Sequence, residues 1–221
     1  YSDDDGGTWM GYHHSLGLGP IHRKTKLASG PWTSSSYKAW NISTGNRSYY
    51  DTAVYYCYNK HTGIWCYTSF DGGASFEFGG LVFADPSGSS HGAISTAPDG
   101  TVYVTPRVAT PTVIVSKDNG SPGSWDERDM GKDVGTPDPR KTSEVSTDSA
   151  SNAYHVWTGA DEGIYMSRSM NSGETWEQES IRISPVEVIS SVFPQTDAGD
   201  PGRIAITYLG SENAEMLKQS D

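Results

Sequence analysis

The two cysteines are the residues whose spacing points most directly to chemistry. Cys57 and Cys66 flank residues 58–65, and a turn centred on positions 61 and 62 places them opposite one another on two antiparallel strands. Side chains at opposed positions fall on the same face of a hairpin, so a cross-strand disulfide can form. Two buried free thiols are the equally supported alternative.

Two further features could carry a modification or an ion. Asn-x-Ser/Thr tripeptides begin at Asn41, Asn46 and Asn119, and such tripeptides accept N-glycans in secreted proteins. They favour a secreted or cell-surface location. The acidic run at residues 3–5 offers oxygen ligands of the kind that calcium prefers. The histidines show no spacing typical of a metal site, so we expect no metal beyond this candidate calcium and no other cofactor.

The composition argues against two classes of partner. The 221 residues carry a formal net charge of -11, whereas nucleic-acid binding needs clustered Lys and Arg. No apolar run approaches the roughly 18 residues of a membrane span, so we expect no membrane insertion. The 25 glycines, 13 tyrosines and 7 tryptophans are typical of short strands joined by tight turns. The sequence therefore predicts an all-β protein.

One turn motif, Ser-x-Asp/Asn-x-Gly followed by an aromatic residue, recurs four times. Its Asp or Asn can accept hydrogen bonds from backbone N–H groups one or two residues on, and its glycine supplies a positive φ. The aromatic side chain then returns to the core. In chain order the motif residues are Ser2, Asp4, Gly6 and Trp9; Ser69, Asp71, Gly73 and Phe76; Ser116, Asp118, Gly120 and Trp125; and Ser169, Asn171, Gly173 and Trp176.

The spacing of these turns matches one blade of a β-propeller. The Asp or Asn positions lie 67, 47 and 53 residues apart. The flanking apolar segments predict three strands before each turn and one after it, which is a four-stranded antiparallel blade. The predicted units of this single propeller region are the end of a blade at 1–20, a blade with a long excursion at 21–80, blades at 81–135 and 136–185, and the start of a blade at 186–221. The prediction is an incomplete propeller with about three whole blades and two partial ones.

The repeated turn resembles the Asp-box, or BNR repeat, of the sialidase (neuraminidase) superfamily. Through the repeats the resemblance covers almost the whole chain, and it implies a β-propeller. Asp-boxes lie at the blade periphery in that family and also occur in non-catalytic relatives, so they do not imply a reaction. A sialidase-like site implies three arginines that hold a substrate carboxylate. The Phe/Tyr-Arg-Ile-Pro segment that usually supplies the first of them is absent here.

Four residues are candidates for such a site. Arg107 ends a predicted second strand and could face a central funnel, where Arg140 could join it. Arg203 begins an apolar strand directly after a turn. Glu144 lies in a predicted strand and could be the buried partner of an arginine. A surface position for Arg107, a solvated loop for Arg140 and a salt-bridged strand end for Arg203 are the simpler explanations, and an exposed strand face is the alternative for Glu144.

Three functions stay open on the sequence. The first is an exo-sialidase-like glycoside hydrolase, or a fragment of one, that acts on sialylated or related glycans. The second is a non-catalytic propeller that binds a glycan or a protein. The third is a structural cell-surface or filament module whose open blade edges pair with another chain or with the remainder of a larger propeller. Arginines clustered with a Tyr–Glu pair in one funnel would favour the first.

Overall fold

The fold consists of β-strands throughout the part of the chain that can be described. A computed structural model describes residues 6–8, 23–32, 51–60, 62–85, 91–130, 134 and 142–213. These residues form fourteen strands and, within the same ranges, no α-helix. The predicted all-β class is confirmed.

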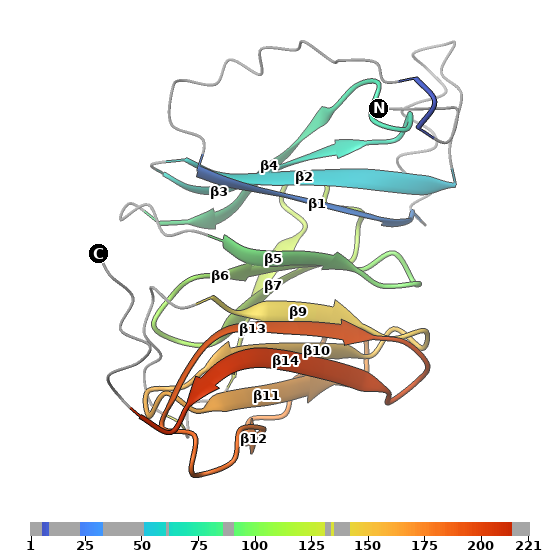
Figure 1. Ribbon diagram of the computed structural model, residues 1–221. Helices are drawn as coiled ribbons and strands as arrows, with labels where there is room; N and C mark the ends of the chain where they lie inside the picture. Colours follow the sequence, from blue (N-terminus) through green and yellow to red (C-terminus); the bar gives the residue numbers. More distant parts are fainter. Residues whose placement is uncertain are drawn as a thin grey trace.

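Three four-stranded antiparallel sheets follow one another along the chain, and a two-stranded sheet follows them (Figure 1). The first blade contains β1 (Arg23–Pro31), β2 (Thr52–Lys60), β3 (Gly63–Ser69) and β4 (Glu77–Ala84). The second contains β5 (His91–Thr96), β6 (Val102–Pro106), β7 (Thr112–Ser116) and β8 (Trp125–Asp129). The third contains β9 (Glu144–Thr147), β10 (Ala153–Thr158), β11 (Ile164–Ser169) and β12 (Ile181–Arg182). The partial fourth blade contains β13 (Ser190–Ala198) and β14 (Ile204–Ser211).

The first strand of each blade lies next to the first strand of the following blade. The Thr96 hydroxyl on β5 donates to the Ser29 carbonyl on β1 over 2.7 Å, and the Thr147 hydroxyl on β9 donates to the Thr96 carbonyl over 2.8 Å. The hydroxyl oxygens of Ser146 on β9 and Thr196 on β13 are 3.0 Å apart. The four inner strands are therefore joined in sequence, as an incomplete propeller requires. The blade predicted at 1–20 lies outside the described residues, except for 6–8.

The first blade extends beyond its predicted boundary. Position 80 falls inside β4, which continues to Ala84 and pairs it with Gly63. The two glycines at 79 and 80 do not end the strand. Gly80 has a φ of +107° within it, and a Cβ atom on Gly79 would lie 2.8 Å from the Gly120 carbonyl oxygen. Because these glycines have no side chain, the boxed turn of the second blade can lie close against β4.

The hairpin of β2 and β3 carries the predicted disulfide. Cys57 is paired with Cys66 in the strand register, and the turn lies between Lys60 and Gly63. The two sulfurs are bonded, with the Cα atoms 4.1 Å apart, and both side chains are buried. The alternative of two free thiols is therefore wrong.

The three described copies of the Ser-x-Asp/Asn-x-Gly motif, which we call boxed turns, share one hydrogen bond. The backbone N–H of Gly73, Gly120 or Gly173 donates to the hydroxyl oxygen of the motif's own serine over 2.8, 3.0 or 2.9 Å. The serine thus holds the turn against the end of its incoming strand. In the first copy, Gly6 has a positive φ of 87°, whereas Ser2, Asp4 and Trp9 lie outside the described residues.

The carboxylate or amide of the turn reaches further along the chain than predicted. Asp71 accepts from the backbone N–H of Ser75 over 2.8 Å, and Asn171 accepts from that of Thr175 over 3.0 Å. Both partners lie four residues on, not one or two, because the side chain spans the whole turn. In the remaining copy Asp118 accepts instead from the Ser121 hydroxyl over 2.7 Å.

The boxed turns also connect neighbouring blades. Trp176 is buried, and its ring contacts Tyr103 of the second blade edge-to-face with ring centroids 6.4 Å apart. The indole N–H of Trp125 donates to the Gly79 carbonyl of the first blade over 3.2 Å. Phe76 is only half-buried and contacts Tyr56 of its own blade, so the predicted return to the core is clearest for Trp176.

A second set of turns joins the blades at the ends of the inner strands. Asp148, 1% exposed, accepts from the Tyr154 hydroxyl over 2.8 Å and from the backbone N–H of Gly202 in the fourth blade over 2.9 Å. Burial by itself raises the pKa of Asp148. Hydrogen bonds from Gly202, Asn152 and Tyr154 outweigh that effect and lower this pKa to about 2. Asp148 therefore stays ionised and holds the third blade to the fourth.

One of the three glycosylation candidates is incompatible with the fold. Asn119 is fully buried in its boxed turn and has a φ of +50°, so its side chain cannot carry a glycan in the folded protein. Asn41 and Asn46 lie outside the described residues and stay predictions.

We expect Gly173→Ala to destabilise the protein more than Gly202→Ala. Both glycines have a positive φ, of 76° and 75°, so an alanine at either position should lower the free energy of unfolding by about 1–2 kcal/mol through its left-handed backbone conformation. A Cβ at position 173 would also lie 2.6 Å from a ring carbon of Tyr103, whereas one at position 202 meets no atom within 4 Å. Overpacking should add about 1–3 kcal/mol, measurable by urea unfolding. Equal losses would show that the boxed turn does not need this close approach.

Candidate functional site

Three of the four residues expected to form one site are described, and they lie at two different faces of the propeller. Arg107 follows the end of the second strand β6, and Glu144 begins the inner strand β9; these positions share a face, which we call the Arg107 face. Arg203 precedes the second strand β14 and is exposed beside the end of the inner strand β13. It therefore lies at the opposite face, and the structure does not bring it together with Arg107 and Glu144. Arg140 lies outside the described residues.

Glu144 is held in a polar environment between inner strands. Glu144 is 8% exposed, and its carboxylate accepts a hydrogen bond from the Gln195 amide on β13 over 3.2 Å. Burial raises the pKa of Glu144, while the positive charge of Lys26 on β1 and the Gln195 hydrogen bond oppose the rise. Among the described residues, its hydrogen-bond partner is thus an amide and not the expected arginine. Neither Lys26 nor Gln195 was identified from the sequence, because their strands meet only in the folded propeller.

A larger depression lies at the periphery, between the boxed turns of the second and third blades. We call it the rim groove. It has a volume of about 210 Å³ and belongs to β7, β8 and the boxed turn between them. Its lining residues are Val115, Lys117, Asp118, Ser124, Asp126 and Arg128.

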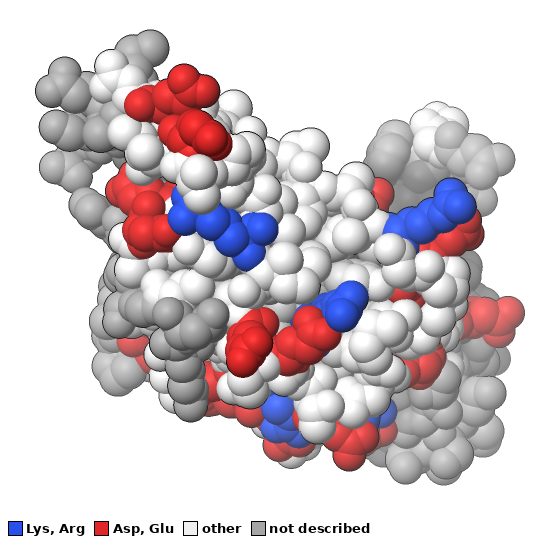
Figure 2. Space-filling view, turned by 90° about the horizontal axis from the view of Figure 1, so that it is seen from below, with Lys and Arg blue, Asp and Glu red and all other residues white. Residues whose placement is uncertain are grey.

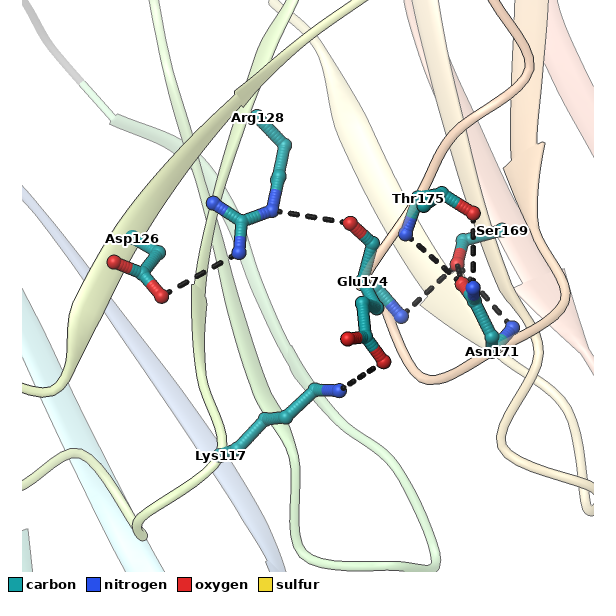
Figure 3. Close-up of polar contacts among 8 residues, drawn as sticks. Lys117, Asp126, Arg128, Ser169, Asn171, Glu174 and Thr175 are labelled. Carbon is teal, nitrogen blue, oxygen red and sulfur yellow. Dashed lines mark hydrogen bonds and ion pairs between the residues drawn. The ribbon is translucent and has the colours of Figure 1, made fainter.

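The boxed turn of the third blade faces the rim groove (Figure 3). The Lys117 ammonium lies 3.3 Å from the Glu174 carboxylate, and the Arg128 Nε donates to the Glu174 backbone carbonyl over 3.3 Å. Arg128 also lies 3.4 Å from the Asp126 carboxylate. These side chains are 33–70% exposed, and such surface pairs typically contribute about 0–1 kcal/mol. A ligand can therefore replace them at little cost.

The rim groove combines two kinds of hydrogen-bonding group. Lys117 and Arg128 can only donate hydrogen bonds, and the carboxylate oxygens of Asp126 and Glu174 are acceptors. A ligand with several hydroxyl groups matches such a set, because each hydroxyl both donates and accepts. Basic and acidic side chains are also interspersed over the face seen in Figure 2, where no extended basic patch appears. No pattern in the sequence indicates this groove, and Glu174, which contacts two of its lining residues, comes from a different blade.

Metal sites and membrane spans were searched within the described residues. No three His, Cys, Asp or Glu side chains are grouped there so as to hold a metal ion, and residues 3–5 lie outside the described part, so the calcium site stays a prediction. No helix that is long and apolar enough to cross a bilayer occurs among the described residues.

Comparisons with known proteins identify the fold but no family. No family model and no curated protein matches the chain. A mutant of the Aleuria aurantia lectin in complex with α-methyl-L-fucoside is similar, with a TM-score of 0.54 and 13% identity, over 84% of this chain and 54% of that chain. The mercury derivative of the fucose-specific lectin from the same organism gives a TM-score of 0.52 and 13% identity, over 84% and 55%.

The chain thus spans about half the length of these lectins, since the matches cover 54% and 55% of the lectin chains. At 13% identity the similarity shows the fold alone. This chain is an all-β propeller of four-stranded antiparallel blades.

Replacing Glu144 by Gln should change how stability depends on pH. Since burial raises its pKa above the ordinary 4.5, this carboxyl favours folding below pH 4.5. That contribution is lost as the pH rises through the raised pKa, at up to about 1.4 kcal/mol per pH unit. The unfolding free energy of the wild type should therefore fall relative to that of Glu144→Gln as the pH rises from about 4.5 through the raised pKa. The same substitution at exposed Glu179 is the matched control. A pH-independent difference between wild type and Glu144→Gln contradicts the prediction.

Proposed function

We propose that this chain is part of a carbohydrate-binding β-propeller, and that the rim groove holds one sugar unit. The observation that carries this proposal is the convergence of donor-only and acceptor-only side chains in one groove of about 210 Å³. That volume is suited to a ligand of monosaccharide size. Charged groups form hydrogen bonds about twice as strong as neutral ones, so Lys117, Asp126 and Arg128 could fix the orientation of neighbouring hydroxyls.

Two other observations support the proposal. The lectins with a similar fold bind fucosides, as their complexes state, so a propeller of this kind can present sugar sites. The Cys57–Cys66 disulfide agrees with a secreted or cell-surface location, where glycans are accessible. We further propose that the outer edge of β14, which pairs with no other described strand, is completed by the remainder of a larger propeller or by another chain.

Binding should be measured by calorimetric titration with a panel of monosaccharides that includes L-fucose, D-galactose and N-acetylneuraminic acid. Lys117→Met and Asp126→Asn should each lower the affinity for the sugar about tenfold or more, because each removes a charge-assisted hydrogen bond of about 1.5–3 kcal/mol. Arg203→Ala removes an exposed charge at the opposite face and should leave the affinity unchanged. Equal affinity in wild type and the two groove variants would refute the site.

Glycoside hydrolysis of the sialidase type is a second candidate, supported by Glu144. A carboxyl whose pKa is raised by burial is suited to general-acid chemistry, and Glu144 lies on the same face as Arg107. Sialidases pair a tyrosine nucleophile with carboxylates, and no such tyrosine is placed beside Glu144 by the described contacts.

The test of this second candidate is turnover of a fluorogenic sialoside by the purified protein. Glu144→Gln should abolish turnover if Glu144 is the acid, whereas Asp126→Asn in the rim groove should not affect it. Absence of turnover by the wild type removes hydrolysis and leaves sugar binding in the rim groove untouched.

A further inference from the structure

The first blade forms one end of the row of described blades, and its two faces differ (Figure 1). Successive side chains of a strand point to opposite faces of its sheet. On one face, buried side chains of β2, β3 and β4 pack against Val104 and Ile114 of the second blade. The intervening residues of β2 and β3, which include Tyr56 and Trp65, therefore point away from the second blade.

Six aromatic rings form a continuous ladder across this second face. Each ring centroid lies 5.5–6.1 Å from the next, and in order the rings belong to Phe76, Tyr56, Tyr58, Tyr67, Phe78 and Trp65. Leu27 on β1 is paired with Tyr56 in the strand register, and Leu81 on β4 is paired with Trp65. We call the ladder and these two leucines the outward face.

The outward face presents apolar groups to water. Leu27 is 65% exposed, Phe78 48% and Leu81 40%, and Tyr56 and Trp65 are half-buried beside them. Contiguous exposed apolar groups mark interaction sites, and aromatic residues are enriched at the centres of protein interfaces. The second and third blades, in contrast, have apolar clusters packed on both of their faces. The outward face is therefore suited to contact with another protein surface.

The opposite end of the row of blades has a polar surface. Ile206 of β14 packs against the third blade, so its strand neighbour Thr207 points away from that blade. Thr207 is exposed, as are Gln195 and Asp197 on β13. Covering this surface with the aromatic ladder would leave an amide and a carboxylate buried without partners, which costs free energy. Head-to-tail contact between the two ends of the row is therefore disfavoured.

We propose that the outward face is the interface of a homodimer, in which it packs against the same face of a second copy of this chain. A two-fold interface uses one patch on both partners, so an apolar patch meets an apolar patch. Two sheets packed face to face lie about 10 Å apart, with their side chains interdigitating. The polar surface of β13 and β14 stays in water. The interface does not depend on sugar binding in the rim groove, which lies at the second and third blades.

Sedimentation equilibrium of the full 221-residue chain tests the interface. At micromolar concentration the wild type should have twice the 23.9 kDa mass of one chain. Phe78→Thr and Leu27→Thr should each raise the dissociation constant of the dimer about tenfold or more, because each removes apolar contact area from both copies. Threonine suits a strand, so the sheet should be retained. Leu209→Thr makes the same change at a 57% exposed position of β14 and should leave the mass unchanged.

Three results would overturn the proposal. The first is a wild-type mass of one chain at every concentration. The second is a mass that grows beyond two chains with concentration, because it would indicate head-to-tail contact. The third is a dimer that persists in Phe78→Thr and Leu27→Thr but is lost in Leu209→Thr, which would place the contact at the fourth blade. Circular dichroism identifies a variant that has lost the fold, and the other ladder-side variant then decides the test.

Discussion

The close approach of the second-blade and third-blade boxed turns to the blade before each of them is the constraint on which the other features depend. A Cβ atom at Gly173 would lie 2.6 Å from a ring carbon of Tyr103 in the second blade, and packed interiors leave no room for such an addition. At Gly120 a Cβ would meet Thr68 and Tyr55 of the first blade at an ordinary contact distance of 3.4 Å, so there the positive φ of +69° is what favours glycine. The third-blade turn can therefore reach the second blade only because its motif has glycine. The serine that receives the glycine N–H keeps the turn in that conformation.

This docking also places a carboxylate of the third blade beside the rim groove of the second. Once the boxed turn of the third blade rests on the second, Glu174 lies within 3.3 Å of Lys117 and receives the Arg128 hydrogen bond. Lys117 and Arg128 are contributed by β7, its boxed turn and β8, whereas Glu174 is contributed by the adjacent turn. A motif that stabilises the fold thus brings together, at its own tip, the charged groups proposed to bind a sugar. The sialidase resemblance, which places such turns away from the reaction centre, does not suggest this.

Features set by short stretches of sequence could be predicted, and features set by contact between blades could not. The disulfide and the number of blades depend on turns whose residues lie close together in the chain. The sequence alone does not show that β4 continues past position 80, because the requirement for glycine at position 79 comes from its contact with Gly120 in the next blade. The partners of Glu144 were missed for the same reason. The separation of Arg203 from Arg107 could have been predicted, since one precedes a second strand and the other follows one.

The rim groove of the second blade, with Glu174 of the third-blade turn beside it, is the proposed sugar site. A crystal structure of the protein grown with L-fucose, or with whichever monosaccharide binds most tightly, tests it directly. We predict electron density for one sugar ring in the rim groove, with hydroxyls bonded to Lys117, Asp126 or Arg128 and the Glu174 turn still in contact with the second blade. An empty rim groove with the sugar bound elsewhere, or third-blade and second-blade turns that stand apart, would contradict the account.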